Sequence, residues 1–165
     1  RENVEQLWQY VFDGTIDTIG SDHGPYTDEE KTQQGDFWKE LCGFGGYDAL
    51  LAGLLTEGVH RRGLSLPTLS KITASNVAEI MHLAPKKGSL MPGCDADILV
   101  VDLNREWTFD GTRSFSKTKS IHNIYHGMQM KGKVLQTYVR GQLVYDEGKF
   151  FVQEGYGKYI PRQHV

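Results

Sequence analysis

Residues 15–25 read TIDTIGSDHGP, a β-branched run followed by an acid, a histidine and a Gly-Pro turn. The first half of this stretch, residues 15–20, predicts a short strand. The chain before it places four apolar residues on one face of a predicted helix, at Val4, Leu7, Trp8 and Val11. A helix that leads into a strand with an acid at its end is the α/β arrangement in which catalytic residues occupy strand ends. The stretch therefore predicts an α/β fold and selects Asp22 as a candidate functional residue.

Asp22 lies between Ser21 and His23, at the end of a run of the kind that sheets bury, where a carboxylate is poorly placed for simple solvation. Such a carboxylate can ligate a metal or act as a general base on a metal-bound water. The Ser-Asp pair is also common in turns, where the side chain caps the backbone. The residues alone leave both interpretations open.

The rest of the first half of the chain predicts three more helices. The first carries the leucines of residues 50–55 and stops at Gly58. The second opens at Ser65, and Ser75 caps the third. Between residues 26 and 46 the chain is polar and then glycine-rich, which predicts a long functional loop.

After residue 84 the pattern becomes that of β-structure. Residues 98–101 read ILVV, which favours a strand. Residues 135–145 alternate apolar and polar side chains around a turn at Arg140-Gly141, which predicts a hairpin. The second half is therefore expected to be mostly β.

The composition limits the classes of protein. The chain has 165 residues, the length of one domain, and its 19 glycines indicate many tight turns. The 18 Lys and Arg against 21 Asp and Glu give a formal net charge of −3, which argues against a nucleic-acid-binding domain. No apolar run has the ~18–20 residues that cross a bilayer, and no signal peptide is visible. Two cysteines fit a reducing cytosol, so we expect a cytoplasmic protein with neither nucleic-acid nor membrane partners.

The sequence contains no cluster with the spacing of a complete metal site. His122 and His126 are four residues apart, but the segment between them does not look helical, which favours loop histidines. The loop at residues 42–46, CGFGG, does not match a phosphate-binding loop. Asp22 remains the strongest candidate on local chemistry.

Several stretches, in the same order, resemble the cyclic amidohydrolases, the family of hydantoinases, dihydropyrimidinases, allantoinases and dihydroorotases. Residues 16–25 resemble the family's final barrel strand, and residues 55–59 the helix end after its glycine-rich loop. Residues 87–102, KGSLMPGCDADILVVD, resemble its return into a β-sandwich, and residues 127–141 the next hairpin of that sandwich. Together these stretches are distributed over most of the chain, from residue 16 to residue 141.

This resemblance implies the fold class and the domains. It implies an α/β chain made of the C-terminal part of a TIM-like (β/α)8 metal-dependent hydrolase barrel and part of a β-sandwich domain. Residues 1–83 would supply the last strand and helices of the barrel, residues 84–150 the C-terminal part of the sandwich, and residues 151–165 a tail that contacts another subunit. The partners implied are the missing N-terminal part of the barrel and further copies, in a homotetramer or homodimer.

The resemblance also implies the chemistry. The family's barrel holds two divalent metal ions, expected to be zinc, bridged by a carboxylated lysine and ligated by four histidines and one aspartate. This chain carries only the aspartate, at Asp22, which would ligate one metal, take a proton from the attacking hydroxide and pass it to the leaving nitrogen. The substrate would be a small cyclic amide or ureide of hydantoin, dihydropyrimidine or allantoin type. The chain by itself is expected to be inactive and to bind metal weakly.

The glycine-rich loop is expected to contact the substrate through the backbone of Cys42, Gly43 and Phe44. Tyr26 follows the hydantoinase pattern, whereas the loop at residues 42–46 is closer to that of allantoinases. The alternative function is that of a non-catalytic relative that keeps the fold and serves as an assembly or scaffold protein. The presence of Asp22 favours the enzyme.

Overall fold

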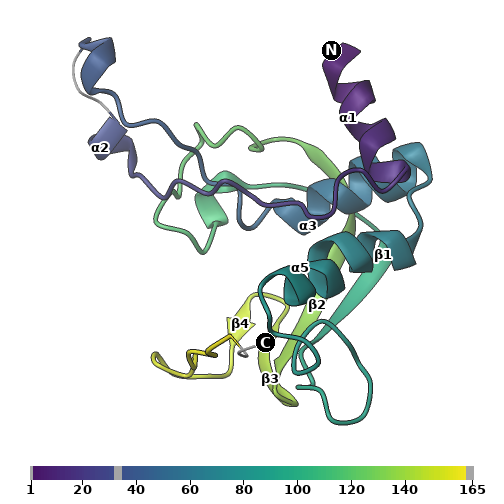
Figure 1. The fold of residues 1–165 in the computed structure, drawn as a ribbon. Helices are drawn as coiled ribbons and strands as arrows, with labels where there is room; N and C mark the ends of the chain where they lie inside the picture. The colour runs from purple at the N-terminus through teal and green to yellow at the C-terminus, as the bar shows by residue number, and fades with distance from the viewer. Residues whose placement is uncertain (1, 32–34, 163–165) are drawn as a thin grey trace. The chain divides into compact units, whose positions relative to one another are not determined.

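The computed structural model describes residues 2–31 and 35–162, and Figure 1 shows how their helices and strands follow one another along the chain. Contacts within the chain divide it into two compact units. The first unit comprises Arg1–Ile19, Gly58–Asp102 and Val134–Val165. The second comprises Gly20–Glu57 and Leu103–Lys133. The domain boundaries expected from the sequence stay predictions.

The first unit opens with helix α1, Glu2–Phe12, which confirms the helix predicted from the apolar spacing. The helix ends before Gly14, whose φ of 81° is readily adopted by glycine and rarely by other residues. Val11 is buried, and the guanidinium of Arg62 lies 5.0 Å from the centre of the Trp8 ring. A buried side chain and a cation–π contact therefore hold α1 on the first unit.

The strand predicted over residues 15–20 is wrong, because the segment has no regular secondary structure. The amide of Ile16 donates to the carbonyl of Tyr10, and the amide of Ile19 donates to a carbonyl at Ile72. Both acceptors belong to helices. A strand forms only where a neighbouring strand pairs with it, and a β-branched composition supplies no such partner by itself.

Residues 50–62 form one helical run, in which α3 (Leu50–Gly53) continues into the π-helical η2 (Leu54–His60) and two further helical residues. The stop predicted at Gly58 is therefore wrong. A Cβ on Gly58 would lie 3.0 Å from the ring of Trp8, so this glycine permits close packing and does not end the helix.

A second helical run follows in the first unit: α4 (Leu66–Ser70), the π-helical η3 (Lys71–Ser75) and α5 (Asn76–Ile80). The start at Ser65 is confirmed, since its hydroxyl accepts the amide of Thr68 at 3.1 Å. The helix predicted after Ser75 is confirmed as α5, but its predicted cap is wrong, because Ser75 has helical backbone angles, makes no side-chain capping bond and continues the run from η3. No helix of the described residues is long and apolar enough to cross a bilayer.

The strands of the described residues form one sheet, in the order β1 (Ile98–Thr108), β2 (Gln129–Val139), β3 (Gln142–Asp146) and β4 (Lys149–Phe150). The predicted hairpin is confirmed, since β2 and β3 are antiparallel and Val139 pairs with Gln142. Arg140 and Gly141 between them have φ values of 51° and 78°. Two consecutive left-handed residues are what a tight two-residue hairpin turn requires.

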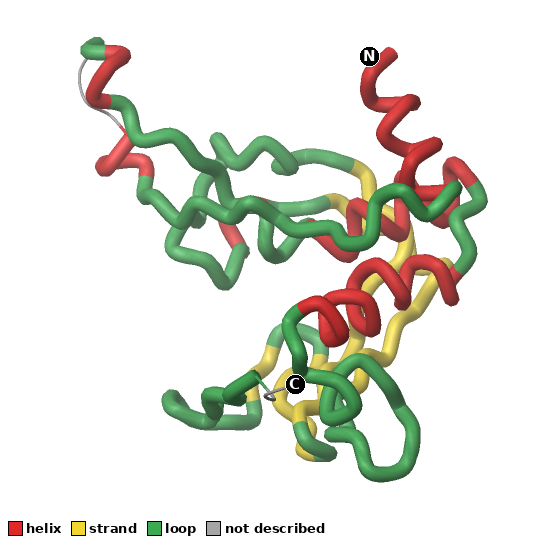
Figure 2. Tube along the Cα trace, in the orientation of Figure 1, coloured by secondary structure: helices red, strands yellow, loops and turns green. Residues whose placement is uncertain are grey.

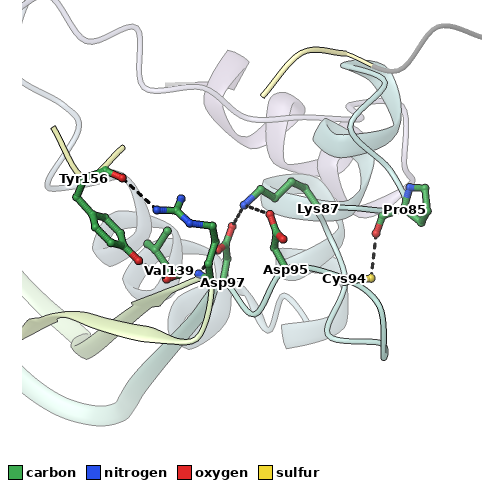
Figure 3. A network of polar contacts seen from close by, with 8 residues as sticks. Pro85, Lys87, Cys94, Asp95, Asp97, Val139 and Tyr156 are labelled. Carbon is green, nitrogen blue, oxygen red and sulfur yellow. Dashed lines mark hydrogen bonds and ion pairs between the residues drawn. The ribbon is translucent and has the colours of Figure 1, made fainter. Parts of the chain in front are cut away.

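A network of polar contacts in the first unit connects the residues before β1 with the hairpin turn and the tail (Figure 3). The ammonium of Lys87 lies 2.9 Å from Oδ2 of Asp95 and also binds Asp97. Asp97 accepts the amide of Arg140 at 2.8 Å. Arg140 donates in turn to the carbonyl of Tyr156 at 3.0 Å. The network therefore fastens both the entry to β1 and part of the tail to one turn.

The same network shifts the pKa of two groups. The hydrogen bond from Lys87 lowers the pKa of Asp95 below its ordinary value of 3.8. Burial by itself would lower the pKa of Lys87, but the hydrogen bonds and charges of Asp95 and Asp97 outweigh it and raise that pKa above 10.5. The folded state thus favours the charged form of each group.

The second unit has a small core built by α3 and the adjoining ends of β1 and β2. Its buried members are Ala49, Ala52, Phe109 and Met130, with Trp107 and Tyr125 packed against them. The rest of this unit consists largely of loops (Figure 2), interrupted by the short helices α2 (Asp28–Lys31), η1 (Phe37–Lys39) and η4 (Gly111–Arg113). The candidate site lies among these loops.

Candidate active site around Asp22

Asp22 is exposed to solvent and has a φ of 46°, in the left-handed backbone region. Aspartate adopts this region more often than most residues, yet it does so at an energetic cost that surrounding contacts must offset. The residue selected from the sequence therefore also has an unusual backbone, and the contacts of its neighbours explain how that backbone is held.

The residues after Asp22 run beside the glycine-rich loop. His23 pairs with Phe44 as an isolated parallel bridge, and the amide of Gly24 donates to the carbonyl of Phe44 at 3.0 Å. A Cβ on Gly24 would lie 2.8 Å from the Cα of Gly43. The two backbones approach so closely that only glycine fits at these positions. The structure thus brings the two residues that follow Asp22 into contact with the loop predicted to bind the substrate.

The ring of His23 is bonded through both of its nitrogens. Nδ1 accepts the amide of Gly46 at 3.2 Å and the amide of Tyr47 at 3.3 Å. Nε2 lies 3.2 Å from the hydroxyl of Ser116. Because Nδ1 accepts, the proton of the neutral ring is on Nε2, which donates to Ser116. His23 therefore connects the glycine-rich loop with a part of the chain more than ninety residues away.

Ser116 belongs to residues 114–120, in which every second residue carries a hydroxyl, and we call these residues the hydroxyl segment. Its buried hydroxyl residues are only 6–8% exposed: Ser114, Thr118 and Ser120. The residues between the hydroxyls are exposed: Phe115, Lys117 and Lys119. This alternation turns the hydroxyls toward the loops of the second unit and the long side chains toward solvent.

Two carboxylates fasten the ends of the hydroxyl segment. The hydroxyl of Ser114 donates to Asp48 at 2.5 Å, and that of Ser120 donates to Asp28 at 2.6 Å. Between these ends the hydroxyl of Thr118 donates to that of Ser116 at 3.1 Å. Ser116 is thus held in place before it meets the histidine ring.

The three residues predicted to contact substrate occupy different environments. Cys42 is exposed. The carbonyl of Gly43 accepts a hydrogen bond from the ammonium of Lys31. The ring of Phe44 packs edge-on against Tyr125, with 6.3 Å between the ring centres. Their substrate contacts stay predictions.

His122 and His126 lie in turns, which confirms the preference for loop histidines. Nδ1 of His126 accepts the amide of Gly111 at 3.1 Å. Next to it, hydrogen bonds from the hydroxyl and the amide of Thr112 lower the pKa of Asp110 below its ordinary value of 3.8. These contacts stabilise a turn around Gly111, and none of them involves Asp22.

The described residues contain no group of three or more His, Cys, Asp or Glu side chains that would hold a metal ion. Asp22 offers one exposed carboxylate, whose oxygens suit a divalent metal. The nitrogens of His23 are engaged in the bonds described above. The described residues can therefore supply one ligand for a metal site, Asp22, and do not form the complete site by themselves.

Sequence reasoning missed His23 as an anchor and the whole hydroxyl segment. The signal was present in the alternation of Ser or Thr at positions 114, 116, 118 and 120, which has the period of an extended chain with one polar face. Nothing in that alternation, however, indicates which distant residues the hydroxyls meet.

Known proteins resemble this chain along most of its length. It is 35% identical over 162 residues to an L-hydantoinase from Paenarthrobacter aurescens, an alignment that covers 96% of this chain and 34% of that protein. It is 38% identical over 146 residues to an allantoinase from Deinococcus radiodurans, covering 88% of this chain and 31% of the allantoinase. The solved structure of the L-hydantoinase (dihydropyrimidinase) from Arthrobacter aurescens superposes with a TM-score of 0.85 at 34% identity, covering 94% of this chain and 34% of the other.

The chain spans about a third of the length of these relatives. The superposition on the L-hydantoinase structure confirms the expected fold class, an α/β portion of the amidohydrolase barrel architecture. The family resemblance seen in the sequence is confirmed as well, since residues 1–144 match the family described as "Amidohydrolase family". The chain belongs to the amidohydrolase family.

Proposed function

We propose that this chain is the part of a cyclic amide hydrolase that carries the catalytic aspartate, Asp22. The observation that supports the proposal is the exposed carboxylate of Asp22, which has a left-handed backbone and lies between two residues that contact the glycine-rich loop. The relatives named above, a hydantoinase and an allantoinase, favour a ring of the hydantoin, dihydropyrimidine or allantoin type as substrate. The remaining parts of the active site would come from residues outside this chain.

Ring opening requires a proton to move from water to nitrogen. The oxygen of water adds to the ring carbonyl, and the Asp22 carboxylate takes one of its protons. The ring C–N bond then breaks, and Asp22 returns the proton to the leaving nitrogen. The products are a free amine or urea nitrogen and a carboxylic acid, which ionises to the carboxylate by releasing the second proton of the water to solvent, and Asp22 ends the cycle unprotonated.

Divalent metal ions, for which we propose zinc, would supply Lewis-acid activation of the water and of the carbonyl. Within this chain Asp22 would hold one of them through a carboxylate oxygen. The other ligands, including a carboxylated lysine, would lie outside the 165 residues. Backbone groups of Cys42, Gly43 and Phe44 would contact the ring. The tail of residues 151–165 would contact a second subunit.

The test is Asp22→Asn in the full-length protein, assayed for ring opening with hydantoin, dihydrouracil and allantoin. Asparagine keeps the shape of the side chain and loses the proton-accepting carboxylate, so we expect turnover to fall by a factor on the order of 10²–10⁴. Circular dichroism should be unchanged.

Asp17→Asn provides the matched control, because Asp17 is an exposed acid five residues earlier whose backbone carbonyl, rather than its side chain, accepts a bond from Asn76. This variant should open the ring at the wild-type rate. Near-wild-type turnover in Asp22→Asn would remove Asp22 from the mechanism. A full-length wild-type protein that opens none of the three rings would refute the proposed function.

A further inference from the structure

We propose that His23 is a positioning residue that holds the backbone of Asp22 in its left-handed conformation, and that Ser116 of the hydroxyl segment fixes the ring of His23. This inference rests on the proposed function only in giving Asp22 a catalytic role. The structural part of the proposal stands on the contacts of the described residues.

The first step concerns the ring of His23. Its Nδ1 accepts two consecutive amides, those of Gly46 and Tyr47, at 3.2 and 3.3 Å. A side chain that accepts from two adjacent amides fixes its own position relative to that piece of backbone. The ring of Tyr47 also meets the imidazole edge-on, with 5.7 Å between the centres. His23 is therefore bound to the end of the glycine-rich loop.

The second step concerns Nε2, the other nitrogen of the ring. Nε2 donates to Ser116, whose hydroxyl also accepts the amide and the hydroxyl of Thr118, at 3.3 and 3.1 Å. Thr118 is buried, and the two carboxylate bonds described above hold the ends of the segment. The ring therefore lies between two supports, and the one formed by Ser116 is held by bonds that do not involve His23.

The third step joins the ring to Asp22. His23 follows Asp22 directly in the chain, so the position of its Cα limits the torsions that Asp22 can adopt. On the other side of Asp22, the carbonyl of Ser21 approaches the glycine-rich loop so closely that a Cβ on Gly46 would lie 3.0 Å from it. Both neighbours of Asp22 are thus placed against the same loop. With its flanks fixed, Asp22 keeps a φ of 46° and an exposed carboxylate.

This arrangement also explains why the histidine beside the acid need not be a metal ligand. A ring whose nitrogens bond to Gly46, Tyr47 and Ser116 serves to place backbone. Precision in that placement matters, because a displacement of a reacting group by about 1 Å can cost about 10²-fold in rate.

The test compares variants of the full-length protein. In His23→Ala we expect kcat to fall about 10- to 100-fold, because Asp22 leaves its productive position. In His23→Asn the side-chain oxygen takes the place of Nδ1 and accepts the same amides, so kcat should stay within about threefold of wild type. Ser116→Ala leaves the Nδ1 bonds intact and should lower kcat less than His23→Ala does. If His23→Ala does not fold, Ser116→Ala still tests the proposal.

A crystal structure of each variant supplies a readout that is independent of activity. In His23→Ala the φ of Asp22 should leave the left-handed region, and in His23→Asn it should stay there. His122→Ala is the matched control, since His122 is an exposed histidine whose backbone amide, kept in the variant, bonds to Ser120. It should keep both the wild-type kcat and the wild-type backbone at Asp22.

The inference is overturned if His23→Ala keeps the wild-type kcat, or if the φ of Asp22 is unchanged in that variant. It is also overturned if His23→Asn is as impaired as His23→Ala, because the two Nδ1 bonds would then not be the cause. Failure of the proposed function is a separate result: the wild-type protein would open no ring, while the crystal structures would still decide whether His23 holds Asp22.

Discussion

At the scale of single residues, Asp22 differs from the other non-glycine positions of the described chain that have positive φ. His82 lies in the turn that follows α5, where its amide donates to the carbonyl of Glu79 at 3.0 Å. Arg140 and Glu147 each precede a glycine in a two-residue turn between strands, so the turn accounts for their conformation. Asp22 has no such turn to account for it and is followed by a bonded histidine. A left-handed non-glycine residue costs on the order of 1 kcal/mol or more, which marks this backbone as one that the surrounding contacts impose.

The prediction at this scale concerns Lys87. Replacing it by methionine, Lys87→Met, removes the partner that lowers the pKa of Asp95. A carboxyl whose pKa is lower in the folded state stabilises the fold above its unfolded pKa, here 3.8, and loses that contribution as the pH falls through the folded value. The variant should therefore be less stable than wild type at pH 7, and the difference should shrink below pH ~4. Urea unfolding at both pH values measures it.

At alkaline pH the dependence of stability on pH has the opposite sign: stability falls as the pH rises. The raised pKa of Lys87 stabilises the fold below 10.5 and stops doing so as the pH rises through the folded value. Lys86→Met is the control, because Lys86 is an exposed neighbour whose charge is a lesser cause of the Asp95 shift. It should change stability less than Lys87→Met. A destabilisation of Lys87→Met that is equal at pH 7 and pH ~3 would show that lost packing, rather than lost charge, is responsible.

At the scale of elements, the glycine-rich loop is shaped by what packs against each glycine. A Cβ on Gly45 would lie 2.1 Å from the hydroxyl oxygen of Thr118 and 3.1 Å from the side-chain nitrogen of Asn123. Thr118 is buried and β-branched, so it cannot swing aside at low cost. The loop and the hydroxyl segment therefore form one packed structure.

The corresponding prediction is that Gly45→Ala destabilises the protein by about 1–3 kcal/mol through overpacking. Ring opening should fall with it, because the displaced Thr118 supports Ser116. Urea unfolding and the ring-opening assay measure the two effects.

Gly53→Ala is the matched substitution inside α3, where nothing lies within 4 Å of the added methyl group. It should stabilise the protein by about 0.5–1 kcal/mol, because alanine loses less conformational freedom in a helix than glycine. Equal effects of the two alanines would contradict the packing argument for Gly45.

At the scale of the whole molecule, the central fact is that the chain spans about a third of the relatives that it matches. Its two units each have a local core or network, yet several large apolar side chains of α1 are exposed: Val4, Leu7, Tyr10 and Phe12. The described residues likewise hold one candidate metal ligand and no complete metal site.

The prediction at this scale is that the isolated 165-residue chain does not bind zinc tightly in a stoichiometric amount. One carboxylate is a weak ligand set for a metal that takes about four ligands in proteins. Equilibrium dialysis followed by elemental analysis measures the bound zinc, with the full-length protein as the positive control. One or more zinc ions held per isolated chain through dialysis against a chelator would contradict the prediction.

Local patterns in the sequence correctly predicted the features that depend only on residues close to one another along the chain. The apolar spacing of residues 4–11 predicted α1, Ser65 predicted the start of α4, and Arg140-Gly141 predicted the hairpin. The same patterns failed at Gly58 and Ser75, where packing across the unit or the continuity of the helix overrides the local signal.

By itself the sequence determined the family, the candidate acid and the turns, because motifs and turn residues act over a few positions along the chain. Only the tertiary structure decided that residues 15–20 are not a strand, that His23 serves as an anchor, and that Ser116 reaches it from more than ninety residues away. The physical reason is that strand pairing and side-chain hydrogen bonds need a partner, and which distant partner arrives is settled by how the whole chain packs.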